Sequence, residues 1–191
     1  MIYITSDTHF MHGKDFLYGP RGFSSPEEMS EAIVSNWNSV VSPDDTVYHL
    51  GDVVLTDTEK GLEYFKQLNG NIMLIRGNHD SDARMRLFSE LPNVTYLGYA
   101  NMLKYKKWMF YLSHYPTLTS NLDDATKPIK ARVINLCGHS HTKDRWADID
   151  KGLIYHVELD AHNNYPVLLD DIIEELRQLK NNEEKLDTVV D

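Results

Sequence analysis

The stretch Arg76-Gly77-Asn78-His79-Asp80 directly follows the apolar run Ile72-Met73-Leu74-Ile75. This run has the length and the composition of a buried β-strand. In open α/β sheets, binding residues gather at the carboxyl ends of the strands, because the loops there reach a shared crevice. A single polar segment of this kind is more often an ordinary turn between a strand and a helix. The prediction of a site therefore depends on whether other strands end in similar residues.

Two strands predicted upstream end in the same kind of chemistry. The run Ile2-Tyr3-Ile4 leads to Asp7 and His9, which lie two positions apart and can point the same way at the end of a strand. The run from Thr46 to Leu50 leads to Asp52. Three strand ends in the first half of the chain thus carry carboxylate, amide or imidazole groups.

Helices are predicted between these strands. Ser25-Pro26-Glu27-Glu28 combines an N-cap serine, a proline at the first helical position and a capping-box glutamate, and this helix should end near Ser42-Pro43. Thr56-Asp57-Thr58-Glu59 is a second capping box, and a short helix is predicted from Met85 to Leu91. Alternating strands and helices predict parallel strands joined by right-handed crossovers.

The second half of the chain has short strands with brief connections. Lys106-Lys107 fits a tight hairpin turn between two of them, although it lacks the usual Asn-Gly signal. The strands are predicted at Val94 to Leu97, Met102 to Tyr105, Trp108 to Leu112, Val133 to Cys137 and Leu153 to Leu159. Two of them again end in imidazoles, which are His114 and the pair in Gly138-His139-Ser140-His141.

The remaining segments are a polar loop and the C-terminal region. The loop runs through Asp123, Asp124 and Pro128, and the last helix should begin near Asp170. Residues 182–191 are acidic and are expected to fray. The chain has 191 residues and shows no internal repeat or linker, so we expect one domain that spans residues 1–191.

Composition limits the classes of function. The formal net charge of −10 argues against a broad basic surface for nucleic acid, although bound cations could still attract a small phosphorylated substrate. Cys137 is the single cysteine, which excludes an intramolecular disulfide and favours a reducing compartment. The start of the chain lacks a signal-peptide pattern, and no apolar run could span a membrane. We expect a cytoplasmic protein that does not bind membranes.

The polar residues at the strand ends have the chemistry of metal ligands. Oxygen donors and imidazoles, with no thiolate pattern, favour divalent Mn, Fe, Ni, Co or Zn over a structural cysteine-type zinc site, and Mn²⁺ is our first choice. Seven plausible ligands are too many for one ion with open positions, whereas two ions that share a carboxylate would use them well. The full set of strand-end residues is Asp7, His9, Asp52, Asn78, His79, Asp80, His114, His139 and His141.

The motifs Asp-x-His, Gly-Asp, Gly-Asn-His-Asp, His and Gly-His-x-His, in this order from Asp7 to His141, resemble those of the calcineurin-like metallophosphoesterase superfamily. Several independent motifs in the right order are far more specific than any one of them. The opening Ser-Asp-Thr-His-Phe is similar to that of small bacterial and phage members. The resemblance implies an α/β fold, a four-layer α/β/β/α sandwich of two mixed sheets.

The resemblance also implies a role for each residue. The ligands of one ion would be Asp7, His9 and His141. The ligands of the other would be Asn78, His114 and His139. Asp52 would bridge the two ions.

Two further residues would act in catalysis. His79 would be the imidazole that protonates the leaving oxygen, and Asp80 would fix its tautomer. The implied activity is hydrolysis of small phosphodiesters or phosphomonoesters by a metal-bridging hydroxide, without a covalent phosphoenzyme. We slightly prefer phosphodiesters, because a short chain without a large cap leaves room for two substituents on phosphorus.

Five other residues have more open interpretations. His12 and Arg76 are candidates for substrate binding, against an exposed loop histidine and a surface ion pair. His49 is either a partner of the Asp52 loop or a satisfied strand histidine. Lys143 and Arg145 could hold phosphate oxygens, although surface ion pairing is the commoner fate of such residues.

The sequence disfavours three alternative functions. The segment from Cys137 to Lys143 almost matches the cysteine-phosphatase loop, but lysine stands where that loop needs arginine, so we predict a small buried thiol. A non-catalytic scaffold with the same fold, like that of the retromer subunit, usually lacks ligands that this chain retains. A nuclease lacks a visible basic track. The expected partner is a small phosphorylated molecule, with a nucleotide among the candidates, and the sequence does not indicate the oligomeric state.

Overall fold

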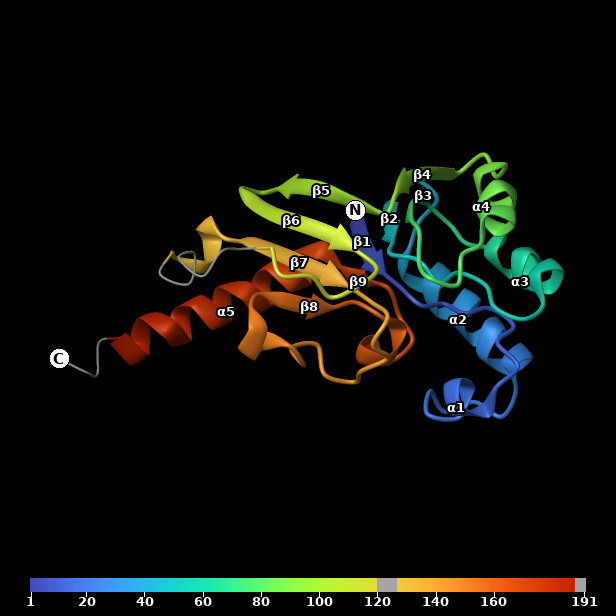
Figure 1. Ribbon diagram of the computed structural model, residues 1–191, viewed down its shortest axis with the longest axis horizontal. Helices are drawn as coiled ribbons and strands as arrows, with labels where there is room; N and C mark the ends of the chain where they lie inside the picture. The colour runs from blue at the N-terminus through green and yellow to red at the C-terminus, as the bar shows by residue number, and fades with distance from the viewer. Residues whose placement is uncertain (120–126, 188–191) are drawn as a thin grey trace.

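The structure is a computed structural model that describes residues 1–119 and 127–187, and its core is two mixed β-sheets (Figure 1). The first sheet has the order β4-β3-β2-β1-β9. Its strands are β1 (Ile2–Thr5), β2 (Thr46–His49), β3 (Asn71–Ile75), β4 (Val94–Gly98) and β9 (Val167–Leu168). The first four are parallel, and β9 is antiparallel to β1.

The second sheet has the order β5-β6-β7-β8. Its strands are β5 (Ala100–Tyr105), β6 (Trp108–Ser113), β7 (Val133–Cys137) and β8 (Ile154–His156). β5 and β6 form an antiparallel hairpin, whereas β7 lies parallel to both β6 and β8. Lys106 and Lys107 make the two-residue hairpin turn as predicted, with φ of 48° and 70°. Positive φ at both positions matches the twist of a β-hairpin.

Three helices cover the outer face of the first sheet, as Figure 1 shows. They are α2 (Pro26–Val40), α3 (Thr58–Phe65) and α4 (Asp82–Ser89). Alternation along the strands directs one set of residues toward these helices, and Val47 and Ile72 pack there with the fully buried Trp37. We refer to this as the first apolar cluster. The short helix α1 (Asp15–Tyr18) adds the buried Leu17 to it.

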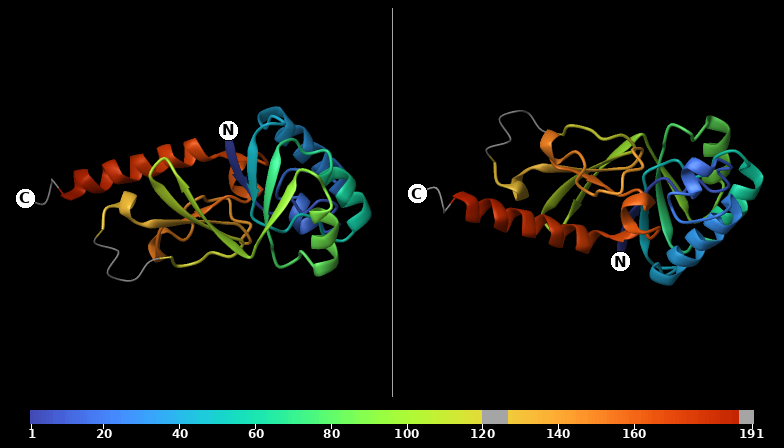
Figure 2. Two further views of the ribbon diagram at one scale, coloured as in Figure 1. Left: turned by 90° about the horizontal axis from the view of Figure 1, so that it is seen from above. Right: turned by 90° about the horizontal axis from the view of Figure 1, so that it is seen from below.

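The other face of the first sheet packs in a second apolar cluster. Here Ile4 and Ile75 join Phe110 and Leu136 of the second sheet. The helix α5 (Leu169–Asp187) follows β9 directly and contributes buried side chains such as Ile172. It runs alongside the second sheet, away from the first (Figure 2). The predicted class, α/β with two mixed sheets and flanking helices, is confirmed.

The N-cap residue was predicted correctly for α2, whereas α3 and α4 begin at other residues than predicted. Ser25 caps α2 by accepting the backbone N–H of Glu28 at 3.1 Å, as predicted. In α3 the cap is Asp57, whose side chain accepts the backbone N–H of Lys60 at 3.1 Å, and not Thr56, which has a left-handed φ of 73°. The helix α4 begins at Asp82 behind a Ser81 cap, three residues before the predicted start at Met85.

Other differences lie in the C-terminal part. Only residues 154–156 of the strand predicted from Leu153 to Leu159 form β8, and the short 3₁₀ helix η4 (Leu159–His162) follows. The sequence did not reveal β9 or α1. The helix α5 continues to Asp187, so 182–187, which we expected to fray, are helical. Residues 188–191, and the loop at Asp123 and Asp124, lie outside the described residues.

The described residues also include the 3₁₀ helices η2 (Ile129–Ala131) and η3 (Ile149–Lys151). Within the described residues, no helix has both the length and the apolar character that crossing a membrane would demand.

Candidate metal centre

The carboxyl ends of five strands from both sheets meet at one place. The loops after β1 and β2 are joined by backbone hydrogen bonds, in which the N–H of Asp7 donates to Gly51 O and the N–H of His9 donates to Asp52 O, each at 3.0 Å. Across the second sheet, the N–H of Gly138 donates to His114 O, also at 3.0 Å. These bonds align the strand-end loops, and all seven residues predicted as metal ligands converge.

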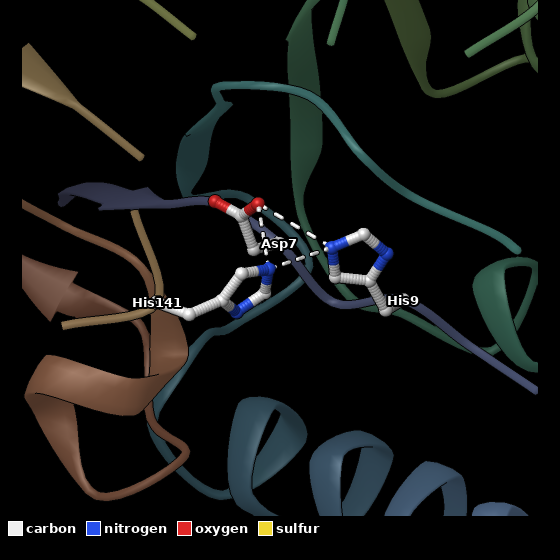
Figure 3. Close-up of side chains that lie close together, drawn as sticks. All are labelled: Asp7, His9 and His141. Carbon is white, nitrogen blue, oxygen red and sulfur yellow. Dashed lines mark hydrogen bonds and ion pairs between the residues drawn. The ribbon is translucent and has the colours of Figure 1, made fainter. Parts of the chain in front are cut away.

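Three of these residues form one group of donor atoms, in which Asp7, His9 and His141 point toward a common centre (Figure 3). Oδ1 of Asp7 lies 3.4 Å from Nε2 of His9 and 3.7 Å from Nε2 of His141. The two Nε2 atoms are 3.2 Å apart. We call this set the first donor group.

Three others form a second donor group. Oδ1 of Asn78 lies 2.7 Å from Nε2 of His114 and 2.9 Å from Nδ1 of His139. Oδ2 of Asp52 lies between the two groups, at 3.4 Å from Nε2 of His114 and 3.6 Å from Nε2 of His9. The other Asp52 oxygen, Oδ1, accepts the backbone N–H of His79 at 2.8 Å. Oδ2 is therefore the Asp52 atom that both groups face.

The buried polar atoms of the first donor group fit a cation. Among the described residues, Oδ1 of Asp7 is one of the buried side-chain atoms without a hydrogen-bond partner. An unpaired buried carboxylate oxygen is costly unless a positive charge compensates it. Burial opposes the charged form of Asp7, yet the neighbouring His9 holds the pKa of this carboxyl well below its usual value. An anionic oxygen without a donor, beside two ring nitrogens, is suited to a divalent ion.

The imidazoles differ in their electrostatics. Burial opposes the charged form of His114, but the Asp52 and Asp7 carboxylates outweigh it and raise the pKa of the ring to about 9. Burial lowers the pKa of His9 despite Asp7. Nδ1 of His114 lies 2.9 Å from Leu50 O, so it carries the hydrogen of the neutral ring and leaves Nε2 free as a donor atom. A bound ion requires this neutral form.

Backbone strain is concentrated at the donors. A φ above zero is uncommon for residues other than glycine and is tolerated when the surrounding structure imposes it. Five of the seven predicted ligands adopt it, with φ of 59°, 46°, 58°, 73° and 50° for Asp7, His9, Asp52, His139 and His141. Strain of this kind costs about 1–3 kcal/mol per residue. Its concentration here indicates that the loops are shaped for ligand geometry.

Two glycines allow the loops to approach this closely. A Cβ atom at Gly77 would collide with the Asp52 carboxylate and backbone, and one at Gly138 would collide with the Asp7 carboxylate. Any side chain at either position would displace a predicted ligand.

Asp80 has a different role from the one predicted. Its Oδ2 accepts the backbone N–H groups of Asp52 at 2.8 Å and Gly77 at 2.9 Å, and its Oδ1 accepts that of Val53 at 3.1 Å. Among the described residues, no hydrogen bond joins Asp80 to the His79 ring, so the prediction that Asp80 fixes the tautomer of His79 is wrong. The carboxylate is fully buried beneath the loops, and its acceptor positions are taken by the backbone.

His79 itself stands at the edge of the site. Its side chain is 44% exposed, and its Nε2 lies 3.9 Å from Oδ2 of Asp52. Arg84 donates to the backbone carbonyl of His79 at 2.7 Å and to Thr58 Oγ1 at 3.1 Å. The position of His79 is thus set by its backbone while the ring remains accessible.

Arg21 and Asp160 belong to the site but escaped the sequence analysis. Nε and Nη2 of Arg21 donate to the two Asp160 oxygens at 3.0 and 2.6 Å, and Nη2 also donates to Asp7 O at 2.8 Å. Oδ2 of Asp160 accepts from Nδ1 of His141 at 3.0 Å. Asp160 directly follows the strand predicted to end at Leu159, so the strand-end rule could have found it. Nothing in the sequence singles out Arg21.

The other candidate residues differ in whether they line the cleft over the donor groups. His12 lines the cleft over the donor groups, but Arg76 does not, because its guanidinium is held by Asp82 at 2.5 Å and Tyr99 Oη at 3.1 Å. The structure shows Arg76 in the surface ion pair that was the alternative interpretation, and its binding of substrate stays a prediction. His49 accepts the N–H of Gly51 at 3.2 Å and so supports the loop that carries Asp52.

Three residues of the 137–145 segment lie apart from the donors. Lys143 lines a small cavity beside Arg21 and Asp160, and Arg145 pairs with Glu175 at 2.5 Å. Cys137 is buried, and burial raises the pKa of its thiol. The prediction of a small buried side chain in place of a thiolate nucleophile is confirmed.

Oxygen and imidazole donors at the strand ends of a two-sheet α/β fold define a protein with a candidate site for divalent metal ions. The sequence profile of the calcineurin-like phosphoesterase superfamily domain matches residues 1–156. The chain belongs to this superfamily of phosphoesterases, whose members use divalent metal ions.

Individual relatives extend over most of the chain. An uncharacterised protein of Methanocaldococcus jannaschii, MJ1445, is 35% identical over 177 residues, which are 90% of this chain and 89% of that protein. The crystal structure of AQ665 from Aquifex aeolicus, a protein of unknown function, shares the fold with a TM-score of 0.68 and 24% identity, over 91% of this chain and 98% of that one. A structure described as a novel archaeal phosphodiesterase has a TM-score of 0.45 and 23% identity, over 81% of each chain.

Proposed function

We propose that this protein is a dinuclear metal-dependent phosphoesterase that hydrolyses small phosphodiesters or phosphomonoesters. The observation that carries the proposal is the position of Asp52, whose Oδ2 lies within 3.6 Å of a ring nitrogen in each donor group. Divalent ions held there would polarise phosphoryl oxygens and lower the pKa of a water molecule. The donor set suits Mn²⁺ first, and Fe, Ni, Co or Zn as alternatives.

The first ion would be held by Asp7, His9 and His141, and the second by Asn78, His114 and His139. Asp52 would be shared between them. Asn78 supplies an oxygen without adding charge, so the donors bring two carboxylates to two divalent ions. The remaining positive charge is available to a phosphate.

Proton transfer is assigned to His79. Its exposed ring lines the cleft next to Asp52, where it can donate a proton to the leaving oxygen. Asp80 supports this step indirectly, because it holds the Gly77 and Asp52 loops that set the His79 backbone.

The open cleft favours diesters over monoesters, because it leaves space for a second substituent on phosphorus. The expected partner is a small phosphorylated molecule, with nucleotides among the candidates. A cytoplasmic location is inferred from the single buried cysteine and belongs to the same proposal. All seven donors are present and converge, which disfavours a scaffold that has lost its metal site.

A change of leaving group tests the role of His79. In His79→Ala, activity on p-nitrophenyl esters should fall modestly, because an electron-poor phenolate departs without a proton. Activity on an alkyl or nucleoside diester should fall by about 10²–10⁴-fold, the usual contribution of general acid catalysis. The measurement is kcat/KM for both substrates, with metal content determined on the same samples. Equal losses on both substrates, or loss of an ion, would contradict the assignment.

A further inference from the structure

The cleft over the donor groups has an apolar wall that the proposed chemistry does not use. The cleft has a volume of about 480 Å³. One part of its lining is the site itself, namely His9, Asp52, His79, His139 and His141. The other part comes from two neighbouring segments, with His12, Lys14, Phe16 and Leu17 in one and Leu55 and Thr56 in the other.

Phe16 is presented to this cleft by a helix that is itself anchored. Phe16 and Leu17 are adjacent in α1, and Leu17 is buried in the first apolar cluster. Phe16 is 69% exposed. Single exposed apolar side chains are common on protein surfaces, so exposure alone means little. The distinctive feature is that this ring lies in the lining of the same cleft as the predicted metal ligands.

A chain of ring contacts connects Phe16 with the donors. The Phe16 and His12 rings meet edge to face with centroids 5.4 Å apart, and His12 meets the ligand His9 in the same way at 5.6 Å. Phe16 is therefore two ring contacts away from the first donor group. In a nucleotide, a pentose likewise separates the base from the phosphate.

The charge of the lining also fits an anionic aromatic ligand. The chain has a formal net charge of −10, yet Lys14 brings a positive charge to the cleft next to the Phe16 wall. A positive charge in a cleft attracts an anion locally, even when the net negative charge of the protein repels it. Leu55 adds apolar surface. A flat ring joined to a phosphate matches this combination better than an alkyl or sugar group does.

We propose that the organic group of the substrate is a nucleoside, whose base stacks on Phe16 while its phosphate lies at the donor groups beside Asp52. Phe16 is then a specificity-determining residue. This inference rests on the proposed function, since it places the phosphate at the metal centre.

The test compares ligands that differ only in the base. Dissociation constants are measured by calorimetry on metal-loaded wild type, Phe16→Leu and Tyr99→Leu. The ligands are adenosine 5′-monophosphate and ribose 5-phosphate, each as its non-hydrolysable phosphonate analogue, and inorganic phosphate. Tyr99 is the matched control, because it is an equally exposed aromatic residue, also 69%, that lies outside the cleft. Leucine keeps an apolar side chain but removes the aromatic face.

Wild type should bind adenosine monophosphate about tenfold more tightly than ribose 5-phosphate, as expected for one stacked base. Phe16→Leu should abolish this difference without changing the affinity for ribose 5-phosphate, and Tyr99→Leu should change neither. Equal affinity of wild type for adenosine monophosphate and ribose 5-phosphate would overturn this inference and leave the proposed function intact. Equal weakening of both ligands in Phe16→Leu would do the same. If metal-loaded wild type bound none of the three ligands, inorganic phosphate included, both the proposed function and this inference would be overturned.

Discussion

The two sheets supply the metal centre in different ways. Loops of the first sheet are joined to one another through the backbone, by the bonds from Asp7 and His9 and by the three N–H groups that Asp80 accepts. The loops after β6 and β7 contact the loops of the first sheet through hydrogen bonds that each involve a side chain. Nδ1 of His114 lies at Leu50 O, and the N–H of His139 donates to Oδ2 of Asp7 at 2.9 Å. His141 is held by Asp160, which follows β8.

This difference separates folding from metal binding. The donors of the first sheet are positioned by bonds that form when the chain folds, with or without an ion. The donors of the second sheet depend on side-chain partners and on the ions that would join the two sheets. Substitutions that remove the bonds of the first-sheet loops should lower the stability of metal-free protein. Substitutions that remove the side-chain partners of the second-sheet donors should lower metal affinity.

The largest expected effect is that of Asp80→Ala. The substitution leaves three buried N–H groups without an acceptor, and each such group costs about 1–3 kcal/mol. We expect the free energy of unfolding of metal-free protein to fall by about 3–5 kcal/mol, measured by urea denaturation.

The neighbouring His79→Ala is the control for Asp80. The His79 ring is half exposed, so its removal should change the stability by no more than about 0.5 kcal/mol. An Asp80→Ala protein as stable as wild type would show that the first-sheet loops are not held in this way.

A smaller effect is expected from Asp160→Asn, which weakens the support of His141. Removal of the partner of a ligand histidine typically lowers metal affinity by about 10–100-fold. We expect this loss for one ion only, with the other unchanged, as measured by competition with a chelator of known affinity.

Asp148→Asn is a matched control for Asp160. Oδ2 of Asp148 lies 3.1 Å from Nε2 of the buried His156, which is the same kind of carboxylate–imidazole contact outside the donor groups. This variant should bind both ions as wild type does. Loss of both ions in Asp160→Asn, or equal losses in the two variants, would contradict the separate support of the first donor group.

The comparison also explains what the sequence could predict. Asp7, Asp52 and His114 are each close to the end of an apolar run, and the carboxyl ends of neighbouring strands converge, so strand prediction alone brings the donors together. The strands themselves are recognisable because short apolar runs have few alternatives as core elements. The family resemblance then sorted the donors into two groups, and the geometry is consistent with that sorting.

Contacts that depend on the exact path of a loop were beyond such reasoning. The carboxylate of Asp80 is next to His79 in sequence, but a turn directs it inward to the backbone. Arg21 and Asp160 are 139 positions apart, and their pairing depends on how the whole chain packs. The two-residue strand β9 is too short to leave a pattern in the sequence.

The central claim is that both sheets share one centre of two ions through Asp52. The most direct test is the metal content of wild type and Asp52→Ala, measured by elemental analysis after gel filtration of protein loaded with Mn²⁺. We predict two ions per chain in wild type and reduced occupancy of both in Asp52→Ala, whereas His141→Ala should mainly affect one. An Asp52→Ala protein that retained two ions with wild-type affinity would contradict the shared centre.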